Sequence, residues 1–115
     1  MSDCVFCKIA DGSIPADIVA RNADAVAFRD LDPKAPVHVL VIPTQHLVSV
    51  RDAGGPEADQ LLGALLRFAA GVATDLGLDE RGYRLVTNTG PDGGQSVFHL
   101  HVHILGGRPM AWPPG

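Results

Sequence analysis

Three histidines at alternating positions, His99, His101 and His103, constrain this chain more than any other feature. Because successive side chains of a β-strand point to opposite faces, the pattern predicts a strand over residues 98–105 with the three imidazoles on one face. Four apolar side chains would fill the other face: Phe98, Leu100, Val102 and Ile104. Buried imidazoles need polar partners, so a fold that gathers three of them is expected to use them chemically.

The segment before this strand is rich in glycine, and residues 90–96 read GPDGGQS. Runs of backbone N–H groups in turns form anion-binding concavities. A glycine-rich turn that leads into a strand of histidines therefore predicts phosphate chemistry at histidine. The alternatives are a surface strand with chance histidines and a strand that holds a structural metal. The internal position and the interleaved aliphatic residues exclude an expression tag.

Composition bounds the classes that remain. The chain has 115 residues, of which 46% are hydrophobic, and this suits one domain, 1–115, with its own core. No apolar run is long enough to cross a bilayer, and the N-terminal segment lacks the pattern of a signal peptide, so we expect a cytoplasmic protein without a membrane partner. The net charge of -4 argues against a basic groove for nucleic acid, although a nucleotide would still fit a local pocket.

Hydrophobic patterning predicts two helices and five strands. Helical turns are expected over residues 4–10 and a long amphipathic helix over 56–76, which Gly77 ends. Strands are expected over 17–21, 25–29, 37–42, 84–89 and 98–105, and the third is nearly all apolar and therefore central. The order of these elements predicts an α+β fold, an antiparallel sheet of about five strands with one long and one short helix.

Residues 95–108, QSVFHLHVHILGGR, resemble the signature of the histidine triad (HIT) superfamily, and more closely its Hint branch of histidine triad nucleotide-binding proteins. Further similar segments follow the family order: AFRD at 27–30, APVHVLVIP at 35–43, DLGL at 75–78, YR at 83–84 and WPPG at 112–115. This resemblance implies a HIT-like fold and a nucleotidyl hydrolase. The substrate would be a small molecule that contains a purine nucleoside monophosphate, cleaved at its α-phosphorus, with P–N bonds favoured and no organic cofactor.

The resemblance also implies catalytic roles. His101 would be the nucleophile that forms a nucleotidyl-histidine, which suits an imidazole that is available in its neutral form near pH 7. His103 would stabilise charge on the phosphate. Ser96 would help with the proton of the leaving group, and the N–H groups of Gly94, Gln95 and Ser96 would point toward phosphate oxygens.

The nucleoside would be held by a carboxylate and an apolar slot. Asp30 would accept both ribose hydroxyls, and Asn88 would contact the ribose or phosphate region. The expected purine slot consists of Val5, Phe6, Ile9, Phe28 and Leu31. The alternatives are that Asp30 caps a loop before a proline, that Asn88 is an ordinary turn residue, and that the apolar residues are plain core.

The two cysteines of the chain, Cys4 and Cys7, form a C-x-x-C pair, which in a cytosolic protein favours metal or redox chemistry over a disulfide. The resemblance implies a structural Zn²⁺ held by these cysteines with His46 and His99, a closed tetrahedral set. His99 would then be a ligand within the triad, and His38 would face the triad and support it. The alternative is two free cysteines with His46 merely exposed.

Two further functions remain open: hydrolysis of dinucleoside polyphosphates, and regulation by nucleotide binding with little turnover. Ser96, the glycines at 106–107 and Trp112 are Hint-like and argue against the first. The resemblance also implies a homodimer in which Trp112 lies near the leaving group of the neighbouring site. Two observations agree with a dimer: strand 84–89 suits a sheet edge, and the long helix is broadly apolar. The helix residues concerned are Leu61, Leu65, Phe68 and Val72.

Overall fold

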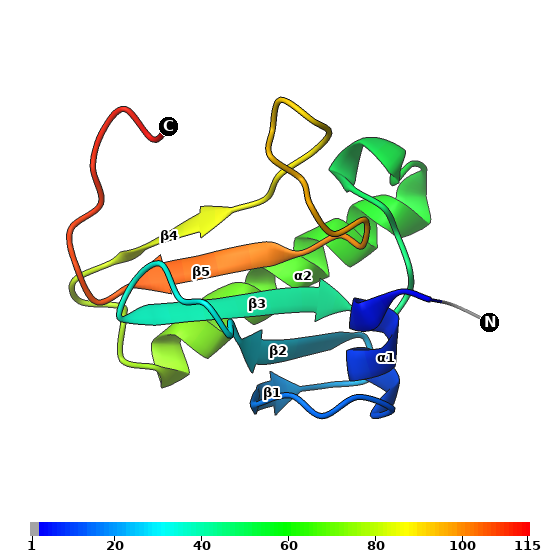
Figure 1. The fold of residues 1–115 in the computed structure, drawn as a ribbon, viewed down its shortest axis with the longest axis horizontal. Coiled ribbons are helices and arrows are strands. Elements are labelled where there is room, and N and C mark those ends of the chain that lie inside the picture. The colour runs from blue at the N-terminus through cyan, green and yellow to red at the C-terminus, as the bar shows by residue number, and fades with distance from the viewer. Residues whose placement is uncertain (1–2) are drawn as a thin grey trace.

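A five-stranded antiparallel sheet forms the centre of the computed structural model, which describes residues 3–115 (Figure 1). The strands are β1 (Ile18–Arg21), β2 (Ala25–Arg29), β3 (Val37–Pro43), β4 (Tyr83–Val86) and β5 (Val102–Gly106), in the order β1-β2-β3-β5-β4. The helices are α1 (Val5–Asp11), α2 (Pro56–Asp75) and the short 3-10 helix η1 (Val50–Asp52). The predicted α+β architecture, with one long and one short α-helix, is confirmed, and β4 is an edge strand as expected.

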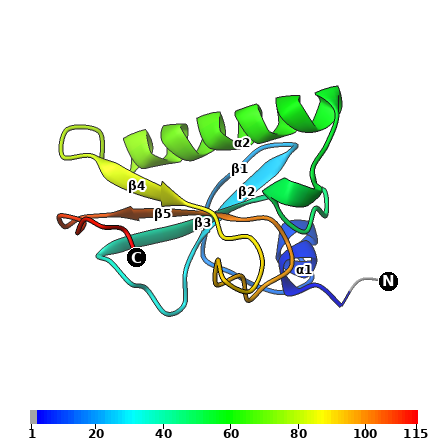
Figure 2. The ribbon, with the colours of Figure 1, turned by 90° about the horizontal axis from the view of Figure 1, so that it is seen from above.

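The two faces of the sheet carry different layers, because α2 lies along one face and α1 lies against the other (Figure 2). Alternation along the strands sorts the side chains between these layers. The α2 side receives Ala25, Ala27, Val39, Val41, Leu100, Val102 and Ile104. The α1 side receives Val26, Phe28, Leu40 and Ile42. The imidazoles of β3 and β5 therefore lie on the side that α1 only partly covers.

Helix α1 is short and has a capping residue at each end. The Cys4 thiol caps its start by accepting the N–H of Cys7 at 3.4 Å. Gly12 ends it in the left-handed conformation at φ 86°, where glycine carries no steric penalty. Phe6 and Ile9 are its buried residues, so its attachment to the sheet rests on two apolar side chains.

Helix α2 begins at Pro56, where a proline costs no helical hydrogen bond. Its buried stripe is Leu65, Ala69, Val72 and Ala73. The expectation that Leu65 and Val72 belong to a surface for a second chain is therefore wrong, because both pack into this chain's own core. Among the described residues, no helix has the length and apolarity needed to span a membrane.

The last two strands are shorter than the sequence predicts. The β4–β5 ladder stops where Val86 pairs with His103, so β4 ends before residues 87–89 and β5 begins only at Val102. Two residues before β5, the Leu100 N–H donates to the carbonyl of Leu47 and not to a carbonyl of a neighbouring strand. His99 and His101 therefore lie in an irregular approach to β5. Phe98, expected in the core, is 61% exposed.

Candidate active site and metal cluster

The central pair of strands places two histidines side by side. In the β3–β5 ladder, Leu40 pairs with His103 and His38 pairs with Leu105, so the two imidazoles are diagonal neighbours on one face. Their ring nitrogens, His38 Nε2 and His103 Nδ1, are 2.8 Å apart. The expectation that His38 faces the triad agrees with this contact.

The ring of His101 is fixed by a backbone carbonyl. Its Nδ1 lies 2.7 Å from the carbonyl oxygen of His99, and because a carbonyl only accepts, Nδ1 must carry the hydrogen. In the neutral ring Nε2 then has a free lone pair. The carbonyl of His101 accepts a hydrogen bond from Thr87 Oγ1 at 2.9 Å, which anchors the backbone of the same residue. His101 is thus held in the tautomer that a nucleophile requires.

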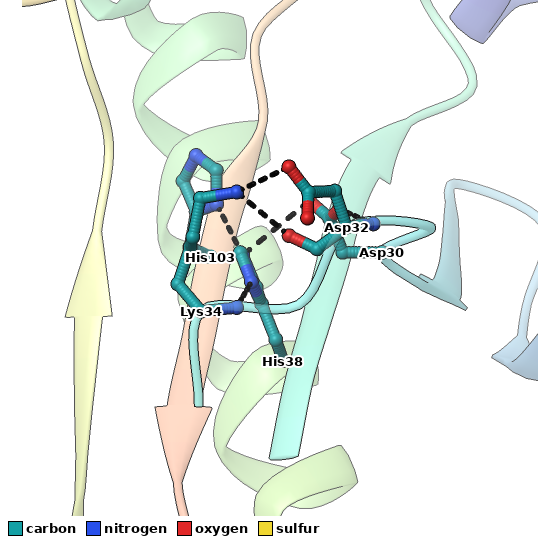
Figure 3. A network of polar contacts seen from close by, with 5 residues as sticks. All are labelled: Asp30, Asp32, Lys34, His38 and His103. Carbon is teal, nitrogen blue, oxygen red and sulfur yellow. Dashed lines mark hydrogen bonds and ion pairs between the residues drawn. The ribbon is translucent and has the colours of Figure 1, made fainter. Parts of the chain in front are cut away.

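A chain of hydrogen bonds fixes the tautomers of His38 and His103 as well (Figure 3). The backbone N–H of Lys34 donates to His38 Nδ1 at 3.0 Å, so the hydrogen of a neutral His38 sits on Nε2. That N–H points at His103 Nδ1, while Asp30 Oδ2 is more distant at 3.5 Å. The hydrogen of a neutral His103 is therefore on Nε2, which leaves this atom as a donor.

Burial keeps these rings neutral. Loss of solvent lowers the pKa of His103 from 6.5 to about 4, and the neighbouring His101 and His38 act in the same direction. Burial also lowers the pKa of His38, and Asp30 opposes this shift. At pH 7 the hydrogen-bond chain therefore operates between neutral imidazoles.

An apolar cavity of about 290 Å³ lies beside the histidines. Its lining includes all five residues expected in the purine slot, Val5, Phe6, Ile9, Phe28 and Leu31, together with Asp30. Phe6 packs edge-on against His101, with ring centroids 5.2 Å apart. The structure thus brings the nucleophile expected from the sequence and the expected base slot into contact.

Asp30 has two functions within the chain itself. Its Oδ1 accepts the N–H of Asp32 at 2.7 Å, which is the loop-capping role considered from the sequence. Its Oδ2 is near His38 Nε2. The carboxylate is thus anchored at one oxygen, and Asp30 is part of the lining of the apolar cavity.

The glycine-rich turn differs from the expectation. The N–H of Gly94 donates to the carbonyl of Pro91 and that of Gln95 to the carbonyl of Gly90, both at 3.1 Å. These two amides are used inside the turn, so in this conformation they do not point toward a phosphate. The Gln95 side chain is buried and donates to the carbonyl of Val48 at 2.6 Å, which pins the turn to the body of the protein.

Asn88 makes a hydrogen bond to the glycine-rich segment. Its Nδ2 donates to the carbonyl of Gly93 at 2.6 Å. Gly93 has no room for a side chain, because a Cβ there would lie 2.4 Å from the carbonyl oxygen of Thr89.

Ser96 is exposed. Trp112 is 81% exposed, and Arg84 holds the segment before it through the carbonyl of Ala111.

A second cluster gathers the four residues expected to bind zinc. The ligand atoms of Cys4, Cys7, His46 and His99 all lie within 4.8 Å of one another. His99 Nδ1 is 3.3 Å from Cys4 Sγ and 3.2 Å from His46 Nδ1. His99 Nε2 donates to the carbonyl of Pro43 at 2.9 Å, so Nδ1 of the neutral ring is the bare nitrogen that faces the thiols.

The donor set fits a tetrahedral ion. Two thiolates and two imidazoles form a common closed set for structural zinc, and the wholly buried His99 already has its second nitrogen satisfied by a carbonyl, as metal-bound histidines usually do. The residues would hold the ion between the start of α1, the segment after β3 and the approach to β5. With four protein ligands, a tetrahedral ion would have no coordination position left for a substrate.

The sequence did not reveal the backbone groups that orient the imidazoles. The amide of Lys34 and the carbonyls of Pro43 and His99 are present in any sequence, and only the fold selects them. Thr87 and Arg108 were missed as well. Arg108 Nη2 donates to the carbonyl of Lys34 at 2.9 Å and so supports the loop whose amide faces His38. The prolines at 33 and 36 stiffen that loop, and they were the one sequence feature that could have indicated its role in orienting His38.

Comparison with known proteins agrees with this geometry. The model of the HIT domain family matches residues 11–110. An uncharacterized HIT-like protein of Synechococcus elongatus is 53% identical over 113 residues, which cover 98% of this chain and 97% of that protein.

Two solved structures are similar along nearly the whole chain. A HIT family hydrolase from Legionella pneumophila is 48% identical with a TM-score of 0.94, and the match covers 98% of this chain and 100% of that one. A histidine triad nucleotide-binding protein from Candida albicans is 31% identical with a TM-score of 0.82, over 96% and 83% of the two chains. The sequence match and the arrangement of His99, His101 and His103 lead to one conclusion: the chain belongs to the HIT domain family.

Proposed function

We propose that this protein is a nucleotidyl hydrolase that acts at the α-phosphorus of purine nucleoside phosphoramidates or related nucleotides. The observation that carries the proposal is the state of His101, whose Nδ1–H is bound to a carbonyl and whose Nε2 carries no hydrogen in the neutral ring. This ring contacts Phe6, which lines an apolar cavity together with Asp30. The hydrolase named among the similar structures supports the reaction type, and the nucleotide-binding protein supports the ligand class.

The proposed reaction has two displacements. His101 Nε2 forms a bond to phosphorus while the P–N bond to the leaving amine breaks, and Ser96 helps to deliver the proton that this amine needs. Water then attacks phosphorus, the bond to His101 breaks, and a nucleoside monophosphate is released. His103 donates its Nε2–H to a phosphate oxygen as charge develops, and His38 keeps that hydrogen in place. No organic cofactor takes part.

The nucleoside would lie with its base in the apolar cavity and its ribose on Asp30. The Asp30 carboxylate in the cavity lining and the apolar walls formed by Phe6 and Phe28 support this orientation. Zn²⁺ would serve as a structural ion at the second cluster, outside the reaction. For a protein with this net charge we expect no nucleic-acid partner.

One experiment tests the proposed reaction. The protein is incubated with an adenosine phosphoramidate and, separately, with diadenosine polyphosphates, and release of AMP is followed. We expect faster turnover of the phosphoramidate, and mass spectrometry of quenched reactions should find the nucleotidyl group on the peptide that contains His101. Faster cleavage of the polyphosphates would favour the alternative hydrolase. Tight AMP binding without turnover of either substrate would favour a regulatory nucleotide-binding protein.

A homodimer is part of the same proposal. The position of β4 at the edge of the sheet and the exposed Trp112 on the tail support it, since unpaired sheet edges are usually covered. Light scattering at micromolar concentration should give twice the chain mass. Trp112→Ala should change the preference among leaving groups while AMP still binds. A fully active monomer would contradict this arrangement.

A further inference from the structure

Phe6 connects the two histidine clusters from the side of α1. It lies between Cys4 and Cys7 in the sequence, yet its side chain is buried against the sheet and only 7% exposed. Its ring meets His101 edge-on, with centroids 5.2 Å apart at 89°, and meets His99 at 6.0 Å. One of the two residues between the candidate thiol ligands is therefore in contact with the ring of the proposed nucleophile.

His99 connects the same clusters through the backbone. Its Nδ1 faces the thiols, and its carbonyl accepts the Nδ1–H of His101 at 2.7 Å. The position of His101 is thus set on one side by Phe6 and on the other by the carbonyl of His99. Both supports originate at the cysteine–histidine cluster.

The start of α1 depends on this cluster for its position. The helix has seven residues, and a helix of this length is not stable by itself in water. Near its other end the carbonyl of Ala10 accepts from Arg21 Nη2 at 2.7 Å, in an exposed contact, while Phe6 and Ile9 provide the buried attachment. An ion bound by Cys4 and Cys7 would therefore restrict the segment that carries Phe6.

We propose that Phe6 is a positioning residue that couples the cysteine–histidine cluster to the nucleotide cavity, so that Zn²⁺ and a nucleoside monophosphate each strengthen the binding of the other. Phe6 lines the cavity from α1, and ordering α1 for one ligand lowers the entropic cost of binding the second. The inference rests on the proposed function, because it requires a nucleotide in that cavity. Such a coupling is reciprocal, and we expect a factor of about five or more in both affinities.

The test measures binding to the two sites. The dissociation constant of AMP is determined by calorimetry for zinc-loaded and zinc-stripped protein. The dissociation constant of Zn²⁺ is determined by competition with a chelator, with and without saturating AMP. We expect the same factor from both routes, and slower hydrogen exchange at the amides of residues 5–9 in the zinc-loaded protein.

Two matched substitutions locate the coupling. Phe6→Leu keeps an apolar side chain but removes the ring that meets His101, so we expect both ligands to bind with a coupling factor near one. Phe28→Leu makes the same change in the same cavity from β2. The ring of Phe28 also meets that of Phe6, with centroids 5.4 Å apart. The change should weaken AMP binding but retain the coupling, because Phe28 is not carried by α1 and Phe6 keeps its contacts with His99 and His101.

The outcomes separate the coupling from the proposed function. Equal AMP affinity with and without zinc overturns the coupling and leaves the nucleotide site intact. Absence of AMP binding in both forms overturns the proposed function and the coupling with it. Circular dichroism checks that the stripped protein is folded. If the stripped protein is unfolded and the coupling persists in Phe6→Leu, the coupling reports folding alone and the role of Phe6 is overturned. An equal loss of coupling in Phe28→Leu would overturn that role as well.

Discussion

The cysteine–histidine cluster consists of Cys4, Cys7, His46 and His99, and we call His38, His101 and His103 the proposed reaction cluster. His99 and His103 are only four residues apart, but their partners differ in kind. His99 Nδ1 faces two sulfur atoms and the ring of His46, whereas His103 Nδ1 accepts a hydrogen bond from another imidazole. Soft thiolates with imidazoles select a closed metal site. Imidazoles linked to one another and to backbone groups can instead hold hydrogens at defined atoms. The comparison teaches that the partner of a histidine, more than its place in a motif, decides its chemistry.

Removal of the His101 imidazole, the proposed nucleophile, should change turnover more than any other substitution. His101→Ala should lower kcat for an adenosine phosphoramidate by about a thousandfold or more, because the covalent route is lost. AMP affinity should stay within about tenfold, since the cavity remains. Steady-state kinetics and calorimetry measure the two quantities.

A control for this variant lies in the metal cluster. Zinc content of His101→Ala should equal that of the wild type, because the His101 side chain is not one of the four candidate ligands. His101→Gly with added imidazole should recover part of the rate if the cavity admits the free base. Near-normal turnover in His101→Ala would exclude the covalent mechanism.

Substitutions in the cysteine–histidine cluster should have the opposite pattern: a large effect on stability and a small effect on turnover. Cys4→Ala and Cys7→Ala should each lose the bound zinc and lower Tm by about 5–15 °C, because binding free energy of the metal contributes to folding. At saturating substrate, kcat per folded molecule should fall by less than about tenfold. Metal analysis, calorimetric melting and kinetics on the folded fraction check this pattern. Wild-type protein prepared without chelator and free of zinc would contradict it.

The sequence predicted the reaction cluster better than the turn that precedes it. Alternation of histidine with aliphatic residues is a local pattern, and it placed Leu100, Val102 and Ile104 in the core correctly. It also extended β5 too far, because strand ends depend on which partner continues the ladder, and here β4 stops at Val86. Phe98 was misplaced for the same reason.

The contacts of the glycine-rich turn could not be predicted from its composition. Many N–H groups in a flexible segment suggested anion binding, but the fold directs the amides of Gly94 and Gln95 to carbonyls inside the turn. The C-x-x-C pair pointed to metal or redox chemistry, but the full set of four candidate metal ligands came only from the resemblance to a family. The pair at 4 and 7 is far in sequence from residues 46 and 99, and no local rule shows that they meet.

The third effect concerns ribose recognition next to the reaction cluster. Asp30→Asn should weaken binding of AMP by about 1–3 kcal/mol, because a charged acceptor for the ribose hydroxyls is lost. Binding of 2′-deoxy-AMP should weaken less, since it offers one hydroxyl fewer. Calorimetry with both ligands measures the difference. Equal losses would show that Asp30 acts through its loop contact with Asp32 instead.

The smallest effect is the pH dependence of stability, and it separates the clusters without a substrate. The folded pKa of His103 is about 4 and the ordinary value is 6.5, so between these values the unfolded chain binds more protons than the folded one. The contribution of His103 to the free energy of unfolding is therefore fully present above about pH 6.5 and is lost as the pH falls toward 4. The lowered pKa of His38 acts in the same direction.

Acid also releases zinc from thiolates and imidazoles, so the two clusters must be separated by substitution. In a variant with both Cys4→Ala and Cys7→Ala, urea unfolding at pH values from 7 to 4 should still show a loss of stability. Adding His103→Asn to this variant should flatten the slope, because the buried ring that resists protonation is gone. If the slope stays unchanged in the triple variant, His103 is not the group responsible. The acid sensitivity would then belong to other groups, of which His38, whose pKa burial also lowers, is the first to test by substitution.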